Sequence, residues 1–381
     1  MSPLSETVLR GRDVHGGGLE VVIDNGRIKA LSAVPVDDET PWIAPGLVDL
    51  QVNGLERGDA NAASPSPDHI AEMARALAAR GVTRFLPTVI TASISDMRDR
   101  IAAIASARTD PLAAAMVAGI HVEGPNLSPE EGPRGVHALE HIRPPAIAEL
   151  TGWLDAAEGL LSVVTLSPHY EDAVEATRFL VAHGVRVSIG HTHADEAQIA
   201  AVVDAGATLS THLGNGAHAM LPRHPNYLWT QLAERRLSAG IIADGHHLPD
   251  TTLATMIEAK RDHGVFIVSD AVATPPALID RGVSTIGGGV AITEDGALRH
   301  VSTGFLAGSV QALDVGVATA ARVTGSLALA VDLASSAPAK LLDGSEPWRI
   351  GARADVIRFT WSPGDDRIRP VDVYIRGQRI A

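Results

Sequence analysis

Eight short apolar runs, rich in Val, Ile and Leu, recur along the middle of this 381-residue chain and are separated by stretches of helical periodicity. This alternation is typical of parallel β-strands joined by helices, because a parallel strand is buried on both faces and needs a crossover to its neighbour. Eight such units close a barrel, so the predicted fold class is α/β, a (β/α)₈ TIM barrel. We expect strands at residues 44–52, 82–89, 116–123, 161–167, 185–191, 208–212, 239–244 and 265–270.

The intervening helices are clearest at three places. Residues 68–80 repeat apolar positions at helical spacing, and residues 195–205 do so until Gly206 stops them. A third helix opens at Pro249 and ends near Gly264, which follows the preference for Pro at the start and Gly at the end of a helix.

The two ends of the chain have a different pattern from the middle. Residues 7–35 and 353–381 alternate apolar and polar positions between turn signals, as short antiparallel strands do. We expect the two ends to pair into one small β-sandwich-like domain. The predicted division assigns residues 1–45 and 341–381 to that domain and residues 46–340 to the barrel.

Composition narrows the classes of partner and chemistry. The formal net charge of -14 argues against a nucleic-acid partner, because neutralising phosphates requires a basic surface. The absence of cysteine excludes disulfides, a thiolate metal site and a cysteine nucleophile, so a metal must bind histidine and carboxylate ligands. No apolar stretch has the length of a membrane span, and residues 1–12 lack a signal-peptide pattern, so we expect a cytoplasmic protein without a membrane partner.

Histidine and carboxylate side chains stand at the ends of four predicted strands: Glu123, His191, His212 and Asp270. The carboxyl ends of barrel strands meet at the face where active sites lie, so these side chains are expected to converge. Two imidazoles and one carboxylate leave an open position for water, whose pKa the metal lowers, as in hydrolytic zinc sites. We therefore predict that Glu123, His191 and His212 bind a metal. Asp270 would be the general base that takes a proton from water and returns it to the leaving nitrogen.

Each of these residues also has a simpler interpretation when it is taken alone. A single histidine at a strand end is more often a hydrogen-bonded structural residue than a metal ligand. An aspartate after a strand, such as Asp270, often caps the following helix. The four placements together favour a catalytic site over these separate explanations.

An ordered set of motifs makes the chain resemble the N-acetylglucosamine-6-phosphate deacetylase family of the amidohydrolase superfamily, almost from end to end. The set comprises residues 44–54 (APGLVDLQVNG), 85–88 (FLPT), 119–125 (GIHVEGP), 190–191 (GH), 211–213 (THL), 242–247 (IADGHH), 269–271 (SDA), 306–309 (LAGS) and 337–339 (APA). The resemblance implies a barrel in which the family's metal ligands fall on Glu123, His191 and His212, and its catalytic aspartate on Asp270. It agrees with the interpretation of the residues themselves.

The metal count is the next expectation. Many amidohydrolases carry His-x-His after the first strand and hold two metals, but this chain has Gln51 and Asn53 there. Amides are poor ligands for a second zinc-like ion, so Gln51 and Asn53 mark a vacant second-metal position. We predict one divalent ion per subunit, with zinc expected and iron, cobalt or manganese as alternatives.

The resemblance also implies the residues that bind the substrate. His137 matches the family's Gly-x-His loop, and His247 matches the histidine of its Ala-Asp-Gly-x-His motif. Asn215 and Gly216 match the Asn-Ala pair that follows the strand-six histidine. Arg223 matches an arginine that binds phosphate and reaches into the neighbouring subunit, which implies a homodimer; a surface residue or a dimer salt bridge is the alternative.

Residues 214–220 and His169 depart from the family pattern, and His121 is a histidine outside its ligand set. Residues 214–220 (GNGAHAM) include an extra His218, and His169 stands where the family usually has glutamate. Both changes fall near the expected sugar pocket, so they bear on specificity. His121, two residues before Glu123, points to the same side of its strand, and we expect it to support the ligands rather than bind metal.

The predicted function is removal of the acetyl group from N-acetylglucosamine 6-phosphate, which gives glucosamine 6-phosphate and acetate. One alternative is an amidohydrolase of a different amino sugar, such as N-acetylgalactosamine 6-phosphate or an unphosphorylated N-acetyl sugar. Another is a barrel that binds a sugar phosphate without turnover. The presence of a base beside three metal ligands counts against that second alternative, because a binding protein needs neither.

Overall fold

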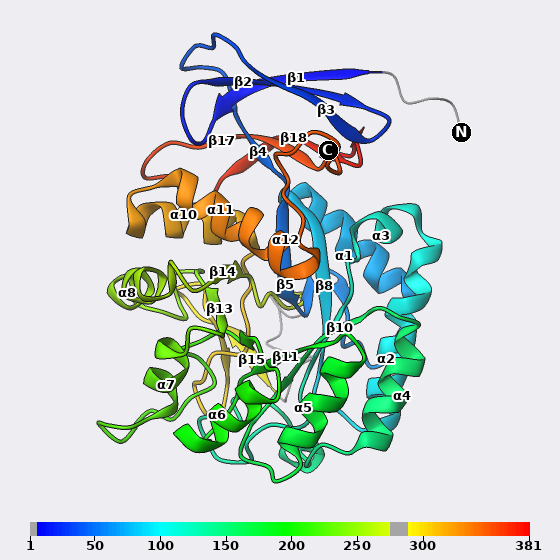
Figure 1. Cartoon of the computed structure of the whole chain (residues 1–381), viewed down its shortest axis with the longest axis vertical. Coiled ribbons are helices and arrows are strands. Elements are labelled where there is room, and N and C mark those ends of the chain that lie inside the picture. The colour runs from blue at the N-terminus through cyan, green and yellow to red at the C-terminus, as the bar shows by residue number, and fades with distance from the viewer. Residues whose placement is uncertain (1–5, 275–288) are drawn as a thin grey trace.

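The computed structural model describes residues 6–274 and 289–381, so residues 1–5 of the predicted terminal domain and 275–288 of the predicted barrel lie outside it. A sheet of eight parallel strands is surrounded by helices (Figure 1). The strands follow one another in the order of the chain, as a (β/α)₈ barrel requires, which confirms the predicted fold class. They are β5 (Leu47–Val52), β8 (Val82–Ile90), β9 (Ile120–Glu123), β10 (Leu161–Leu166), β11 (Arg186–Ile189), β12 (Leu209–Ser210), β13 (Ser238–Ile242) and β14 (Val265–Val268).

Backbone hydrogen bonds between the first and last strands close the barrel just beyond β14. The amide of Asp270 donates to the carbonyl of Gln51 at 2.9 Å, and the amide of Asn53 donates to the carbonyl of Ala271 at 2.7 Å. The seam therefore joins Asp270 to the segment that carries Gln51 and Asn53.

The helices surround the sheet and bury their apolar faces against it. Alternating strand residues divide the core: Val48 and Leu50 face the barrel interior, whereas Leu47 belongs to the layer between strands and helices. The helices are α1 (Pro67–Ala79), α2 (Ile94–Ser106), α3 (Pro111–Met116), α4 (Ile147–Ala157), α5 (Ala173–Ala182), α6 (Glu196–Asp204), α7 (Tyr227–Ala233), α8 (Asp250–Lys260), α10 (Leu313–Thr324), α11 (Leu327–Ala334) and α12 (Ser336–Asp343).

Local capping agrees with the predicted helix starts, whereas α8 ends at Lys260, before the predicted end near Gly264. Asp195 caps α6 in a capping box with Gln198, and Pro249 stands immediately before α8. In α1, the Ser66 hydroxyl accepts from the amide of Asp68, and a proline follows as the first helical residue.

Strands from both ends of the chain form a second sheet, which curls so that β1–β3 lie over β17 and β18 (Figure 1). Its order is β19-β18-β17-β4-β1-β2-β3, and an apolar cluster that includes Leu9, Ile28, Ile43 and Val356 packs within it. These strands are β1 (Thr7–Asp13), β2 (Gly18–Asp24), β3 (Arg27–Ala33), β4 (Trp42–Pro45), β17 (Val356–Thr360), β18 (Arg369–Ile375) and β19 (Gln378–Arg379). Two small hairpins complete the strands: β6 (Gly54–Leu55) with β7 (Gly58–Asp59), and β15 (Val290–Ile292) with β16 (Leu298–His300).

Two predicted strands begin or divide differently in the structure. The run at 44–52 is two strands, because the chain leaves the terminal sheet after β4 and enters the barrel at β5. Gly46 marks this passage: its amide donates to the carbonyl of Asp355, and a Cβ there would lie 2.2 Å from Oγ1 of Thr83. The run at 116–123 begins at Ile120 instead, because Met116 ends the helix α3 that the Asp110 side chain caps.

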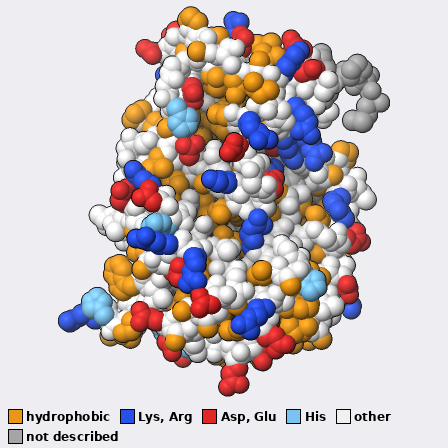
Figure 2. All heavy atoms as spheres, viewed as in Figure 1, with side chains coloured by type: hydrophobic (Ala, Val, Ile, Leu, Met, Phe, Trp, Pro, Cys, Tyr) orange, Lys and Arg blue, Asp and Glu red, His pale blue; other side chains and the backbone are white. Residues whose placement is uncertain are grey.

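The surface in Figure 2 carries acidic and basic side chains interspersed with apolar ones. Within residues 6–274 and 289–381, none of the helices combines the length and hydropathy of a membrane-spanning segment.

Candidate active site

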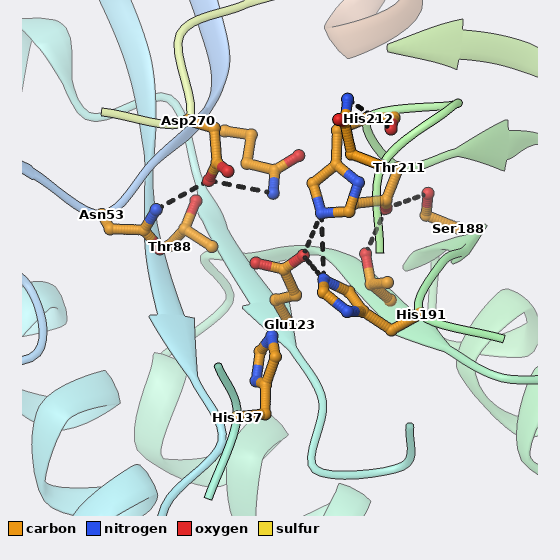
Figure 3. Close-up of polar contacts among 12 residues, drawn as sticks. Asn53, Thr88, Glu123, His137, Ser188, His191, Thr211, His212 and Asp270 are labelled. Atoms are coloured by element: carbon orange, nitrogen blue, oxygen red, sulfur yellow. Dashed lines mark hydrogen bonds and ion pairs between the residues drawn. The ribbon is translucent and has the colours of Figure 1, made fainter. Parts of the chain in front are cut away.

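Four barrel strands deliver the predicted catalytic side chains to one place. Glu123 is the last residue of β9, whereas His191, His212 and Asp270 each stand two residues beyond the end of their strand. Figure 3 shows the side chains of Glu123, His191 and His212 pointing toward one another, with Asp270 and Asn53 beside them. The four side chains therefore converge at the carboxyl ends of the strands, as predicted.

The three predicted metal ligands present one atom each to a common centre. Oε1 of Glu123 lies 3.2 Å from Nε2 of His191 and 2.9 Å from Nε2 of His212. The two Nε2 atoms are 3.0 Å apart. All three side chains are buried, at 8%, 3% and 3% exposure for His191, His212 and Glu123, so bulk water does not screen these contacts.

Hydrogen bonding shows that this centre suits a cation. Nδ1 of His191 donates to the carbonyl of Pro133 at 2.7 Å, so in the neutral ring Nε2 carries a lone pair. That lone pair faces a carboxylate oxygen and a second imidazole nitrogen, an arrangement that requires positive charge between them.

The pKa shifts of Glu123 and His212 also indicate that positive charge is favoured at this centre. Burial alone would raise the pKa of Glu123, but its interactions with His191 and His212 outweigh burial and hold that pKa well below its usual value. Burial lowers the pKa of His212, whereas its hydrogen bond and charge interaction with Glu123 raise it above the usual value. Among the described residues, this is the one group of three His, Cys, Asp or Glu side chains arranged to hold a metal ion.

Asp270 is buried beside this centre and its proton affinity is unusual. Oδ1 accepts hydrogen bonds from Nδ2 of Asn53 at 2.8 Å and from Nε2 of Gln51 at 3.3 Å. Burial, and then the negative charge of Glu123, raise the pKa of Asp270 to about 6. Both amides at the expected second-metal position therefore contact the carboxylate.

The backbone of the site is strained at three residues. His191, His212 and Asp270 have φ angles of 47°, 28° and 48°, which is the left-handed region that residues other than glycine rarely adopt. Such strain concentrates at functional sites, where the surrounding structure holds it in place. Here it turns each side chain out of its strand and toward the common centre.

A cavity of about 290 Å³ opens above the four side chains. Its lining includes most of the predicted substrate-binding residues, namely His137, Asn215, Gly216 and His247. Arg223 lies elsewhere, on an exposed segment before α7, and is not among the described residues that line the cavity.

Two of the lining histidines are held by neighbours that sequence reasoning missed. Nδ1 of His137 hydrogen-bonds Oγ1 of Thr91 at 2.8 Å, and burial lowers the pKa of His137 to about 3. Nδ1 of His247 donates to Oδ2 of Asp244 at 2.9 Å, and the same oxygen accepts from the Ser309 hydroxyl at 2.8 Å. Asp244 and Ser309 both lie in motifs that the sequence analysis identified. Because they are 65 residues apart in sequence, their contact could not be predicted from those motifs.

His121 lies beneath the ligands, inside the barrel. Its Nδ1 donates to the carbonyl of Leu50 at 3.1 Å, and its Nε2 pairs with Oγ1 of Thr165 at 2.7 Å. Burial lowers the pKa of His121 to about 4, so the ring is neutral. A chain of hydroxyls continues from Thr165 to Thr211 and Ser188, and Thr211 directly precedes His212.

Of the two histidines that depart from the family pattern, His218 lines the cavity and His169 is not part of its described lining. The His169 ring packs at a tilt against Tyr170 and His193, with ring centroids 3.8 and 4.2 Å apart. Nδ1 of His169 pairs with the Ser167 hydroxyl at 2.6 Å.

Known proteins share both the sequence and the fold. A model of the amidohydrolase family matches residues 42–377. The N-acetylgalactosamine-6-phosphate deacetylase of Escherichia coli O157:H7 is 30% identical over 363 residues, which cover 93% of each chain. The human N-acetylglucosamine-6-phosphate deacetylase is 34% identical over 366 residues, which cover 89% of this chain and 83% of that one.

A solved structure agrees with these relatives. A mutant N-acetyl-D-glucosamine-6-phosphate deacetylase from Mycobacterium smegmatis, in complex with N-acetyl-D-glucosamine-6-phosphate, superposes with a TM-score of 0.87 at 25% identity. The superposition covers 99% of this chain and 100% of that one. The chain is therefore an enzyme of the N-acetylglucosamine-6-phosphate deacetylase family, within the amidohydrolase superfamily.

Proposed function

We propose that this enzyme hydrolyses the N-acetyl group of N-acetylglucosamine 6-phosphate to glucosamine 6-phosphate and acetate. The observation that carries the proposal is the buried group of Glu123, His191 and His212 with Asp270 beside it, at the bottom of a cavity. Relatives with at least 30% sequence identity bear the names of acetylhexosamine-phosphate deacetylases.

Glu123, His191 and His212 would hold one divalent ion through Oε1 and the two Nε2 atoms. A cation bound there supplies Lewis acidity, which polarises an amide carbonyl and makes water acidic enough to act as a nucleophile near neutral pH. We propose zinc, because a set of two imidazoles and one carboxylate suits it, and iron, cobalt or manganese would be compatible with the same ligands. Gln51 and Asn53 engage Asp270 as hydrogen-bond donors, which supports a single ion.

Asp270 would move the proton. As the water oxygen bonds to the acetyl carbon, the Asp270 carboxylate accepts the proton that water loses. When the carbon–nitrogen bond breaks, the carboxylic acid returns that proton to the amino-sugar nitrogen, and acetate leaves. Hydrogen bonds from Asn53 and Gln51 hold Oδ1 in place, which leaves the second carboxylate oxygen for this transfer.

His137 and His247 would orient the substrate through their Nε2 atoms. If the Thr91 hydroxyl donates to Nδ1 of His137, Nε2 of that ring carries a proton and can donate to the oxygen that gains charge during attack. His247 is fixed by Asp244 through Nδ1, so its Nε2 faces the sugar.

The phosphate group requires a cation from elsewhere. The described lining of the cavity includes neither lysine nor arginine, and a phosphate monoester carries close to two negative charges. We propose that the enzyme is a homodimer in which Arg223 of each subunit enters the other subunit's cavity, where its guanidinium would bind phosphate. The exposed position of Arg223 before α7 supports this assignment.

A second substrate has support of its own. The 30% identity to an N-acetylgalactosamine-6-phosphate deacetylase extends over 93% of both chains, so the epimeric sugar phosphate is the alternative. The two sugars differ in one hydroxyl configuration, which a few hydrogen bonds in the cavity decide.

An acetate-release assay tests the proposal. Protein with a counted metal content is incubated with N-acetylglucosamine, N-acetylgalactosamine and the 6-phosphate of each. We expect the highest kcat/KM for N-acetylglucosamine 6-phosphate. A higher value for the galactosamine phosphate would support the alternative, and absence of acetate release from all four sugars would refute the deacetylase assignment.

A further inference from the structure

Two loops meet across the rim of the cavity. One is the segment 128–137, which carries His137, and the other is the segment 213–218, which carries Asn215 and Gly216. Three side chains join these loops to α7: Glu130, His218 and Tyr227, which we call the latch.

All the hydrogen bonds of the latch are satisfied when the His218 ring carries its proton on Nε2. The Tyr227 hydroxyl accepts from the backbone amide of His218 at 2.8 Å, so its own proton is free to be donated to Nδ1 of His218, at 3.0 Å. Nε2 of His218 then carries the ring proton and donates to Oε2 of Glu130 at 2.9 Å. Both ring nitrogens of His218 are therefore engaged by protein groups, although the ring lines the cavity.

Backbone packing shows how closely the loops approach each other. A Cβ on Gly132 would lie 2.9 Å from Cα of His218 and 3.0 Å from the carbonyl oxygen of Ala217. A Cβ on Gly216 would lie 2.7 Å from Nδ1 of His191. The two loops thus contact one another and His191, and a shift of either loop would change the wall of the cavity.

The loop 128–137 is itself attached to the metal-binding centre. The carbonyl of Pro133 accepts the hydrogen bond from His191, and the amide of Ser128 donates to the carbonyl of His191 at 2.9 Å. Glu130 is held by its amide, which donates to the Ser128 hydroxyl at 3.1 Å. The latch therefore connects this fixed loop to the segment 213–218 through the side chain of His218.

We propose that His218 is a positioning residue that sets the affinity for the sugar phosphate by holding the segment 213–218 against the segment 128–137. This inference rests on the proposed deacetylase function for its kinetic consequence. The hydrogen bonds of the latch join its three side chains to one another and to the backbone of His218, and none of them involves Asp270 or the three metal-binding atoms. We therefore expect the latch to affect substrate binding more than the chemical step.

Kinetics on metal-loaded protein tests the role of His218. For His218→Ala we expect KM for N-acetylglucosamine 6-phosphate to rise about tenfold, which corresponds to ~1.4 kcal/mol, with kcat within about twofold and unchanged metal content. Glu130→Gln keeps an oxygen acceptor and should retain nearly the wild-type KM, whereas Glu130→Ala should not. Tyr227→Phe keeps the ring but loses the hydroxyl that hydrogen-bonds His218, so its KM should lie between those of Glu130→Gln and Glu130→Ala. His183→Ala, an exposed histidine at the end of α5, is the control.

Amide hydrogen exchange tests the latch without reference to the substrate. Exchange in the segments 128–137 and 213–218 should be faster in His218→Ala and in Glu130→Ala than in the wild type. The double variant should exchange no faster than either single variant, and His183→Ala should exchange like the wild type. Unchanged exchange in His218→Ala would overturn the latch, and faster exchange with an unchanged KM would overturn its control of affinity. If wild-type protein released no acetate from any sugar, the proposed function would fail, while the exchange data would still decide whether the latch exists.

Discussion

At the scale of single residues, Asp270 is where burial and hydrogen bonding act on the same carboxyl group in opposite directions. Burial raises its pKa to about 6, and the hydrogen bond from Asn53 lowers it. A general base works only when it is deprotonated, so activity should be present above this pKa and be lost as the pH falls through it. A bound cation favours the carboxylate, so the acid limb of kcat/KM should lie at or below pH 6.

Changing Asn53 should move that limb in a known direction. In Asn53→Ala the carboxylate loses a donor that favours its charged form, so the pKa of Asp270 should rise and the acid limb should shift to higher pH. A profile of kcat/KM from pH 4.5 to 8 measures the shift. A limb that moved to lower pH, or did not move, would contradict the assignment of Asp270 as the titrating base.

One pair of variants separates the proposed metal ligands from the proposed base. Glu123→Gln removes the charge that attracts the cation, so the purified protein should lose most of its metal after dialysis. Asp270→Asn should retain the metal yet lose activity by about 10²- to 10⁴-fold, the usual effect of removing a general base. Elemental analysis beside the acetate assay checks both, and metal loss in Asp270→Asn would show instead that Asp270 is a ligand.

At the scale of elements, the strand predictions were correct in number and order but too long at the site. Residues 185–191, 208–212 and 265–270 were expected to be strand throughout, yet β11, β12 and β14 each end two residues before those ranges do. The reason lies in His191, His212 and Asp270, whose positive φ angles cannot continue a strand. An apolar run indicates where a strand is buried, but only the tertiary structure shows where side chains leave it.

Close packing between elements gives a prediction about stability. Gly58 in β7 lies against α1, where a Cβ would be 2.4 Å from both N and Cα of Met73. These are backbone atoms that a side-chain rotation cannot move, so Gly58→Ala should lower the free energy of unfolding by about 1–3 kcal/mol. The matched control is Gly152→Ala in α4, where a Cβ meets no heavy atom within 4 Å and should stabilise the helix by about 0.5–1 kcal/mol. Urea denaturation of both variants measures the difference, and equal changes would refute the packing argument.

At the scale of the whole molecule, the sequence was sufficient to predict which side chains meet, because a barrel brings the carboxyl ends of its strands to one face. Glu123, His191, His212 and Asp270 could be identified in this way before any coordinates. No comparable rule predicts which loops of a barrel contact one another. The carbonyl of Pro133 on His191, the Thr91 hydroxyl on His137 and the Glu130–His218 pair depend on loop conformations that hydrophobic periodicity does not encode.

Subunit exchange is the test of the proposed homodimer, because the cavity of a single chain has no described arginine or lysine in its lining. If Arg223 serves the partner's cavity, Arg223→Ala should raise KM for the phosphorylated sugar and leave KM for the unphosphorylated sugar nearly unchanged. Mixing Arg223→Ala with the inactive Asp270→Asn should then restore activity.

The activity expected of the mixed sample differs clearly from the average of the two separate variants. In a mixed dimer, the Arg223→Ala chain keeps Asp270 and receives Arg223 from its partner, so one of the two cavities is complete. Random exchange makes about half of the dimers mixed, so activity at low substrate should approach about one quarter of the wild-type value. Activity equal to the average of the two separate variants would mean that Arg223 acts within its own chain or not at all, and light scattering on the same samples would show whether dimers are present.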